Sequence, residues 1–130
     1  MKNLKVGICG WGNVATGLYR TINDNKDQIL SNSNLVIDIV VIGARRDNPK
    51  CSPENTLIER DIFDVLNHDI DVMVELIGGV EVARDLILQA INKGIHVVTA
   101  NKAVIYHHGD EIFEQAKKKN VNVLFESSVC

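Results

Sequence analysis

Apolar residues occur along this chain in short β-type runs, and stretches with apolar residues at helical spacing separate these runs. The runs expected to form strands are residues 5–9, 35–42, 72–77, 95–99 and 121–125. Helices are expected from residue 13 onward, over 61–66, over 83–91 and over roughly 109–120. Strands that alternate with helices, without a repeat or a linker, predict an α/β fold with a doubly wound parallel sheet in three layers.

The expected final helix carries charges that suit its two ends. Asp110 and Glu111 would lie in its first turn and lysines 117–119 in its last turn, and both sets of charges favour the helix dipole. His107 and His108 would lie beside the start of this helix. Without further ligands nearby in the sequence, they are expected to be a solvated pair rather than a metal site.

Composition and charge narrow the class of protein. The chain has 130 residues, 45% hydrophobic and 24% charged, as in one ordinary globular domain. Its net charge of −3 leaves no basic surface for nucleic acid. No apolar run approaches the roughly 20 residues that span a bilayer, and no secretory signal is recognised, so a cytoplasmic protein without membrane contact is expected. Three cysteines without C-x-x-C spacing suggest neither a disulfide framework nor a zinc site, and Cys9 is expected to be a reduced, partly buried thiol.

A glycine-rich motif follows the first expected strand. Gly10-x-Gly12-x-x-Ala15 matches the pattern G-x-G-x-x-G/A and opens the first expected helix. In this pattern the first glycine permits a tight turn, the second lets the backbone approach a pyrophosphate, and the small third residue lets helix and strand pack closely. The motif predicts a Rossmann-type dinucleotide-binding fold, and an ordinary strand-to-helix turn is the alternative. Trp11 is expected to pack against the cofactor or a neighbouring loop.

The end of the strand over 35–42 bears on the choice of dinucleotide. NAD-specific sites usually carry an acid there for the ribose 2′-hydroxyl, but this strand runs into Arg45 and Arg46. An arginine can stack on adenine and pair with a 2′-phosphate through its planar fork. NADP is therefore favoured over NAD, with Lys50 as a further cation. The alternative is a pair of solvated loop arginines near Asp47.

The later strands end in polar and glycine-containing segments. They are Ile77-Gly78-Gly79, Thr99-Ala100-Asn101-Lys102 and Glu126-Ser127-Ser128-Val129. Ligands of open α/β sheets bind outside the carboxyl ends of the strands, so these segments should line one crevice. Lys102 is a candidate cation or proton donor facing a carbonyl substrate, and a surface lysine at a helix start is the alternative. Glu75, in a strand that reads as buried, needs a partner such as a backbone N–H or an arginine, and it is assigned no catalytic role.

Several segments together resemble a known family. They are Gly10-Trp11-Gly12-Asn13-Val14, Val74 to Gly79, Val97 to Ala103, His108-Gly109 and Phe125-Glu126-x-x-Val129. Because these segments occur in this order and at this spacing, the whole chain resembles the nucleotide-binding half of homoserine dehydrogenase. The resemblance implies reversible, NAD(P)-dependent reduction of L-aspartate 4-semialdehyde to L-homoserine, on the route to threonine and methionine, by an enzyme that forms a homodimer.

The resemblance also implies roles for individual residues. The residues expected to contact the cofactor include those of the glycine turn. They are Gly10, Trp11, Gly12, Asn13, Val14, Ile77, Gly78, Thr99 and Lys102. Arg45 and Arg46 match a basic position used for the adenosine 2′-phosphate. Lys102 matches a residue that lies beside the nicotinamide and takes part in proton transfer. Glu126 and Val129 match two contributors to a monovalent cation site, usually sodium, whose other ligands lie further downstream.

In one respect the chain departs from the family, whose members continue from a Gly-Gly-Ile-Pro segment into a substrate and dimerisation domain. Residues 1–130 are therefore expected to be a dinucleotide-binding domain, a fragment that binds NADP(H) without turnover and holds sodium poorly. Ala15 stands where the family usually has glycine, which should leave cofactor binding intact. Two alternatives remain: a free-standing NAD(P) sensor, and a reductase of another amino-acid pathway such as diaminopimelate or aspartate dehydrogenase. The segment from Thr99 to Ala103 argues against the second.

Overall fold

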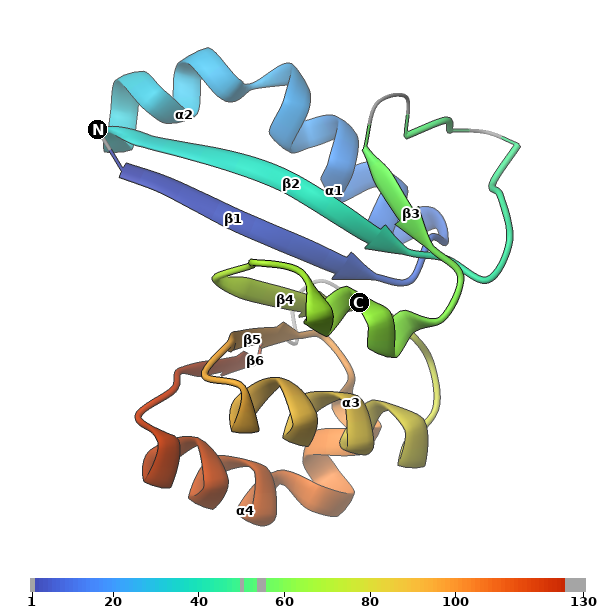
Figure 1. Ribbon diagram of the computed structural model, residues 1–130, viewed down its shortest axis with the longest axis vertical. Helices are drawn as coiled ribbons and strands as arrows, with labels where there is room; N and C mark the ends of the chain where they lie inside the picture. Colours follow the sequence, from blue (N-terminus) through green and yellow to red (C-terminus); the bar gives the residue numbers. More distant parts are fainter. Residues whose placement is uncertain (1, 50, 54–55, 126–130) are drawn as a thin grey trace.

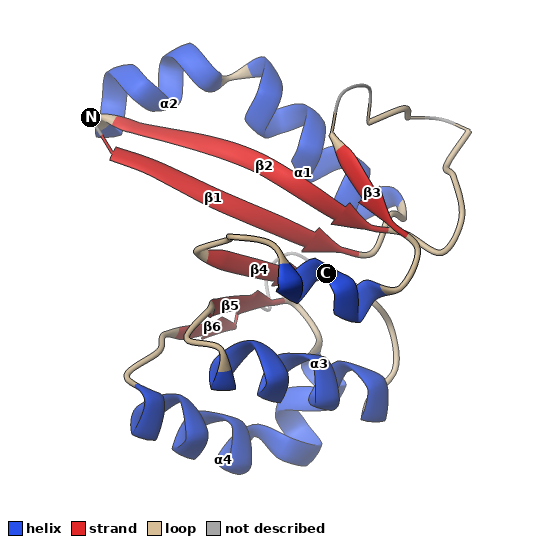
Figure 2. Ribbon diagram, viewed as in Figure 1, coloured by secondary structure: helices blue, strands red, loops and turns tan. Residues whose placement is uncertain are grey.

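The computed structural model describes residues 2–49, 51–53 and 56–125, which form one six-stranded parallel sheet with helices on both faces (Figure 1, Figure 2). The strands are β1 (Lys2–Cys9), β2 (Leu35–Gly43), β3 (Leu57–Glu59), β4 (Val72–Glu75), β5 (His96–Thr99) and β6 (Val123–Phe125). The helices are α1 (Asn13–Asp24), α2 (Lys26–Ser33), the 3-10 helix η1 (Ile62–Asn67), α3 (Glu81–Asn92) and α4 (Lys102–Lys119). None of these helices is long and apolar enough to cross a membrane. The predicted α/β fold in three layers is confirmed.

The strand order β3-β2-β1-β4-β5-β6 places the first strand near the centre of the sheet, and neighbouring strands all pair in parallel. The chain builds outward from β1 through β2 and β3, and then returns to place β4 on the other side of β1. Figure 1 shows that α1 and α2 cover one face of the sheet, whereas α3 and α4 cover the other. All six strands end at the same edge, and the winding reverses between β1 and β4. This is the point at which open α/β sheets bind ligands.

Side chains that alternate along the central strands divide the interior into two hydrophobic cores. Cys9 and Met73 belong to the core beneath η1, α3 and α4, while Ile8 and Val74 belong to the core beneath α1. Because both faces are covered, these strands read as nearly continuous apolar runs. Burial raises the pKa of the Cys9 thiol to about 12, and its Sγ lies 3.7 Å from the carbonyl oxygen of Ile62.

The last helix, α4, begins at Lys102 rather than near residue 109. Asn101 caps it, because its side-chain oxygen accepts a hydrogen bond from the Val104 N–H at 3.0 Å. The prediction that the acids at 110–111 lie in the first turn is therefore wrong, and the first turn of α4 contains no acid. The prediction that lysines 117–119 occupy the last turn is confirmed.

Several smaller elements also differ from the pattern. The edge strand β3 has three residues, which is too short for a periodic signal, and α2 buries none of its residues, so it lacks an apolar stripe. Asn25 separates α1 from α2, because it is the C-cap residue of the first helix and the N-cap residue of the second. The helix expected over 61–66 forms as the 3-10 helix η1, and β4 ends at Glu75, before its expected end. The histidines at 107–108 lie inside α4 rather than beside its start.

Candidate functional site

The turn between β1 and α1 runs across the ends of the neighbouring strands. Gly10 has a φ of +114°, a conformation that residues with a Cβ rarely adopt. A Cβ at this position would lie 2.7 Å from the carbonyl oxygen of Leu76, just after β4. The Gly10 N–H donates to the carbonyl oxygen of Gly43, at the end of β2, at 2.8 Å. The fold itself therefore requires glycine at position 10.

Gly12 meets a different requirement. It is the N-cap residue of α1, and a Cβ built there would meet no atom within 4 Å. Because Gly12 has no side chain to cap the helix, the first N–H groups of α1 remain available to an anion. Asn13 and Val14 are exposed beside this space, whereas Ala15 is buried in the core beneath α1. Open space at the second position and close packing at the third fit the roles that the motif assigns to them.

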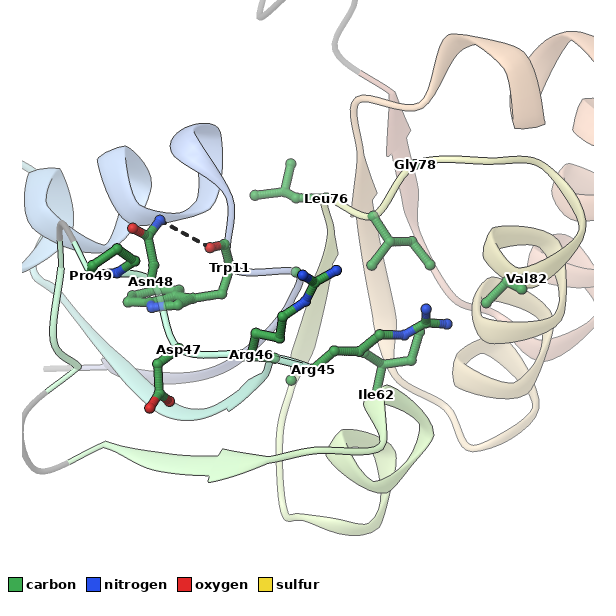
Figure 3. Close-up of a pocket in the computed structure, with 14 residues that line it drawn as sticks. Trp11, Arg45, Arg46, Asp47, Asn48, Pro49, Ile62, Leu76, Gly78 and Val82 are labelled. Carbon is green, nitrogen blue, oxygen red and sulfur yellow. Dashed lines mark hydrogen bonds between the residues drawn. The ribbon is translucent and has the colours of Figure 1, made fainter.

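Trp11 packs against a neighbouring loop, one of its two expected surroundings. Its indole is buried edge-on against Tyr19, with ring centroids 5.3 Å apart, and its Nε1 donates to the carbonyl oxygen of Cys51 at 3.3 Å. The Asn48 side chain in turn donates to the Trp11 carbonyl oxygen at 3.2 Å (Figure 3). These contacts attach the loop after β2 to the glycine turn, so Trp11 helps to fix the position of that loop beside the site.

A pocket of about 580 Å³ lies at the carboxyl ends of β2, β1 and β4, which is a typical size for a small-molecule site. Its lining comes mainly from the glycine turn, from residues 43–49 and from residues 76–78. Figure 3 shows the side chains of Arg45 and Arg46 extending into it from the end of β2. Both side chains are exposed. The first pocket therefore combines the start of the glycine turn, Gly10 and Trp11, with two cationic side chains.

Arg60 holds the loop that carries these arginines, and the sequence analysis missed this residue. Its Nη1 donates to the carbonyl oxygen of Ala44 at 3.2 Å, and its Nη2 lies 2.6 Å from Oδ1 of Asp47. Asp47 is thus paired with Arg60, and Figure 3 shows its carboxylate directed away from Arg45 and Arg46. Arg60 follows β3, an element that the pattern does not predict, so no sequence signal linked it to this loop.

A second pocket, of about 320 Å³, continues the first toward β5. It is lined by Val14, by residues 75–78 and by Ala100, Asn101 and Lys102. The two pockets share Leu76, Ile77 and Gly78, so together they form one groove across the strand ends. Lys102 is exposed, and it is both the first residue of α4 and part of the pocket wall. Both readings of this lysine, helix start and site residue, are compatible with its position.

A buried carboxylate lies beneath the second pocket. Glu75 is fully buried and accepts hydrogen bonds from the Ile77 N–H at 3.0 Å and from the Thr99 hydroxyl at 2.7 Å, as its need for a partner predicts. Burial raises the pKa of the Glu75 carboxyl, and hydrogen bonds from Thr99, Ile77 and Asn101 oppose that rise. Thr99 is also fully buried, so its hydroxyl serves Glu75 and the backbone rather than the groove. Glu126 and Val129, expected at a sodium site, lie outside the described residues.

A doubly wound parallel sheet, with a glycine turn where its winding reverses and a groove across its strand ends, defines a Rossmann-type dinucleotide-binding domain. Residues 10–126 match the family described as "Homoserine dehydrogenase, NAD binding domain". The chain therefore belongs to the homoserine dehydrogenase family, through its NAD-binding domain. The resemblance is confirmed, and the match favours it over a reductase such as diaminopimelate or aspartate dehydrogenase.

Individual relatives support the same family. The homoserine dehydrogenase of Pseudomonas aeruginosa is 51% identical over 131 residues, which cover 100% of this chain and 30% of that protein. The homoserine dehydrogenase of Neisseria gonorrhoeae is 35% identical, again over 100% of this chain and 30% of the relative. A crystal structure of S. aureus homoserine dehydrogenase superposes with a TM-score of 0.87 at 32% identity, over 97% of this chain and 33% of that one. The chain thus spans about a third of the length of these relatives.

Proposed function

We propose that this chain is the cofactor-binding domain of an NADP(H)-dependent homoserine dehydrogenase, which interconverts L-aspartate 4-semialdehyde and L-homoserine. The observation that carries the proposal is the continuous groove from Arg45 and Arg46, past the glycine turn, to Lys102. Residues 1–130 hold the dinucleotide in this proposal. The substrate and dimer contacts, and most of a sodium site that Glu126 and Val129 would join, come from a further part of a cytoplasmic enzyme.

The groove has a suitable group for each part of NADPH. The first N–H groups of α1, beside Gly12, suit the pyrophosphate because they offer unpaired donors and the positive end of the helix dipole. Arg45 and Arg46 suit the adenosine 2′-phosphate in the first pocket. The second pocket, walled by Ile77 and Lys102, is then left for the nicotinamide. This order follows the strand ends from β2 to β5.

Lys102 is the residue of this chain placed to assist the reaction. When bound, NADPH supplies a hydride to a carbonyl carbon. A cation beside the second pocket would stabilise the charge that develops on the carbonyl oxygen, and an ammonium group there can donate the proton that the product hydroxyl needs. Lys102 starts a capped helix, so its backbone is fixed while its side chain is free to reach a substrate. We assign it both roles.

A substitution at Gly12 separates binding from folding. Gly12→Val should weaken NADPH binding at least about tenfold, which corresponds to about 1.4 kcal/mol, because its side chain would occupy the space proposed for the pyrophosphate. The position is open and its backbone is extended, so the change should cost at most about 1 kcal/mol of folding stability, from the poorer N-cap. Calorimetric titration measures the affinity, and urea unfolding measures the stability.

Gly17→Val is the matched control for this experiment. It places the same side chain five residues further along, inside α1, at an exposed position with no atom within 4 Å of an added Cβ. We expect it to bind NADPH within about twofold of the wild-type protein. NADPH affinity that is unchanged in Gly12→Val would contradict pyrophosphate binding at the start of α1.

A further inference from the structure

Glu75 joins the two turns that form the second pocket. At the end of β4, its Oε2 accepts from the Ile77 N–H at 3.0 Å, and its Oε1 accepts from the Thr99 hydroxyl at 2.7 Å. Glu75 and Thr99 are both fully buried, so no solvent competes for these hydrogen bonds. The carboxylate thereby ties the chain after β4 to the last residue of β5.

The connection continues from Thr99 to the start of α4. The Thr99 Oγ1 accepts from the Asn101 N–H at 3.0 Å, and the Asn101 side chain, which caps α4, donates to the carbonyl oxygen of Gly79 at 2.7 Å. The two turns are therefore linked twice, once through Glu75 and once through Asn101. Lys102 directly follows this cap, so its backbone position depends on the same set of contacts.

A purely space-filling role would not need a carboxylate at this position. An apolar side chain of similar size fills a core without the cost of burying a charged or polar group. The two donors that Glu75 satisfies belong to the turns lining the second pocket, whereas no contact of Glu75 reaches the arginines of the first pocket. The carboxylate is thus placed to act mainly on the second pocket, where Asn101 and Lys102 also lie.

We propose that Glu75 is a positioning residue for the nicotinamide end of the bound dinucleotide, an inference that rests on the proposed function and deepens it. Glu75 is fully buried, so it acts through its neighbours: residues 77–78, which both pockets share, and Asn101 and Lys102, which line the second pocket and not the first. The adenosine end lies in the other pocket, beside Arg45 and Arg46. Loss of the Glu75 contacts should therefore weaken binding of the nicotinamide end more than binding of the adenosine end.

Two ligands distinguish positioning from general support of the fold. NADPH spans both pockets, whereas adenosine 2′,5′-bisphosphate carries the adenosine and the 2′-phosphate but lacks the nicotinamide. Glu75→Gln keeps the size of the side chain, but its NH₂ group cannot accept one of the two hydrogen bonds. We expect the dissociation constant of NADPH to rise about fivefold or more, while that of the bisphosphate changes less than about twofold.

A second pair of variants keeps the test valid if Glu75→Gln does not fold. Thr99→Val removes the hydroxyl at nearly constant volume and should reproduce the selective loss of NADPH affinity. Thr99→Ser keeps the hydroxyl and should retain most of that affinity. Ile91→Val, at a buried position of α3 outside both turns, weakens core packing and should leave the affinity for both ligands unchanged.

The outcomes separate this inference from the proposed function. Equal loss of both ligands in Glu75→Gln or Thr99→Val would show a general structural role and overturn the inference. Unchanged NADPH affinity in the folded variants would overturn it as well. Wild-type protein that binds neither ligand would contradict the proposed function itself. Selective loss of NADPH affinity, restored in Thr99→Ser, is the result that supports Glu75 as a positioning residue.

Discussion

Replacing Gly10 with alanine is expected to lower the free energy of unfolding by about 3 kcal/mol. Alanine at a φ of +114° is strained, and its Cβ would lie 2.7 Å from the carbonyl oxygen of Leu76. That segment cannot easily move aside, because the Leu76 N–H donates to the carbonyl oxygen of Cys9 at 2.9 Å. Since domains are typically stable by about 5–15 kcal/mol, the loss should be obvious in urea unfolding followed by circular dichroism.

Gly17→Ala provides the matched control. Gly17 lies inside α1 and is exposed. A Cβ added at this position would have no other atom within 4 Å. Because glycine is unfavourable inside a helix, this alanine should stabilise the protein by about 0.5–1 kcal/mol. The same substitution is thus expected to act in opposite directions at the two positions. If Gly10→Ala unfolds at the wild-type urea concentration, the close contact between the glycine turn and the end of β4 is wrong.

Replacing Arg45 and Arg46 together with alanine should weaken NADPH binding by about a hundredfold and NADH binding by less than about threefold. Hydrogen bonds to charged groups contribute about 1.5–3 kcal/mol each, and only NADPH carries the 2′-phosphate that would receive them. Both side chains extend from the loop after β2 into the first pocket (Figure 3). Calorimetric titrations of the two nucleotides give the two ratios.

A control must separate this local effect from a change in net charge. Lys117 and Lys119 are exposed at the last turn of α4, far along the helix from the strand-end edge where α4 begins. Replacing both with alanine removes the same two charges, and should change the affinity for NADPH less than about threefold. Equal loss of NADPH and NADH in the arginine variant would refute recognition of the 2′-phosphate by these residues.

The sheet was predictable because its strands are buried on both faces. Residues 35–42, in which Asp38 is the only polar residue, are recognised as a strand without any tertiary information. The edge strand β3 has only three residues and pairs with β2 at the edge of the sheet, so its hydrophobic pattern is too short to predict a strand. The start of α4 was not predicted because only Ala100 separates β5 from the N-cap Asn101, and a helix cap so close to a strand resembles the end of that strand.

The residues of the site also fall into those that the sequence predicts and those that it does not. Gly10, Gly12 and Lys102 could be picked out because a motif, or the end of a parallel strand, fixes where such residues lie. Arg60 could not be picked out, since its partners Ala44 and Asp47 are brought to it only by the pairing of β3 with β2. Likewise, the sequence showed that a buried Glu75 needs a partner, but not that its partners would connect two turns of the groove.

The central claim is that a nicotinamide dinucleotide lies across the strand ends from the loop after β2 to the start of α4. Titration of NADPH and of NADH into the wild-type chain, followed by calorimetry, tests this claim most directly. We predict saturable binding of about one NADPH per chain, with a lower dissociation constant for NADPH than for NADH, because one groove with two arginines is present. Folded protein that shows no saturable binding of either nucleotide would contradict the claim.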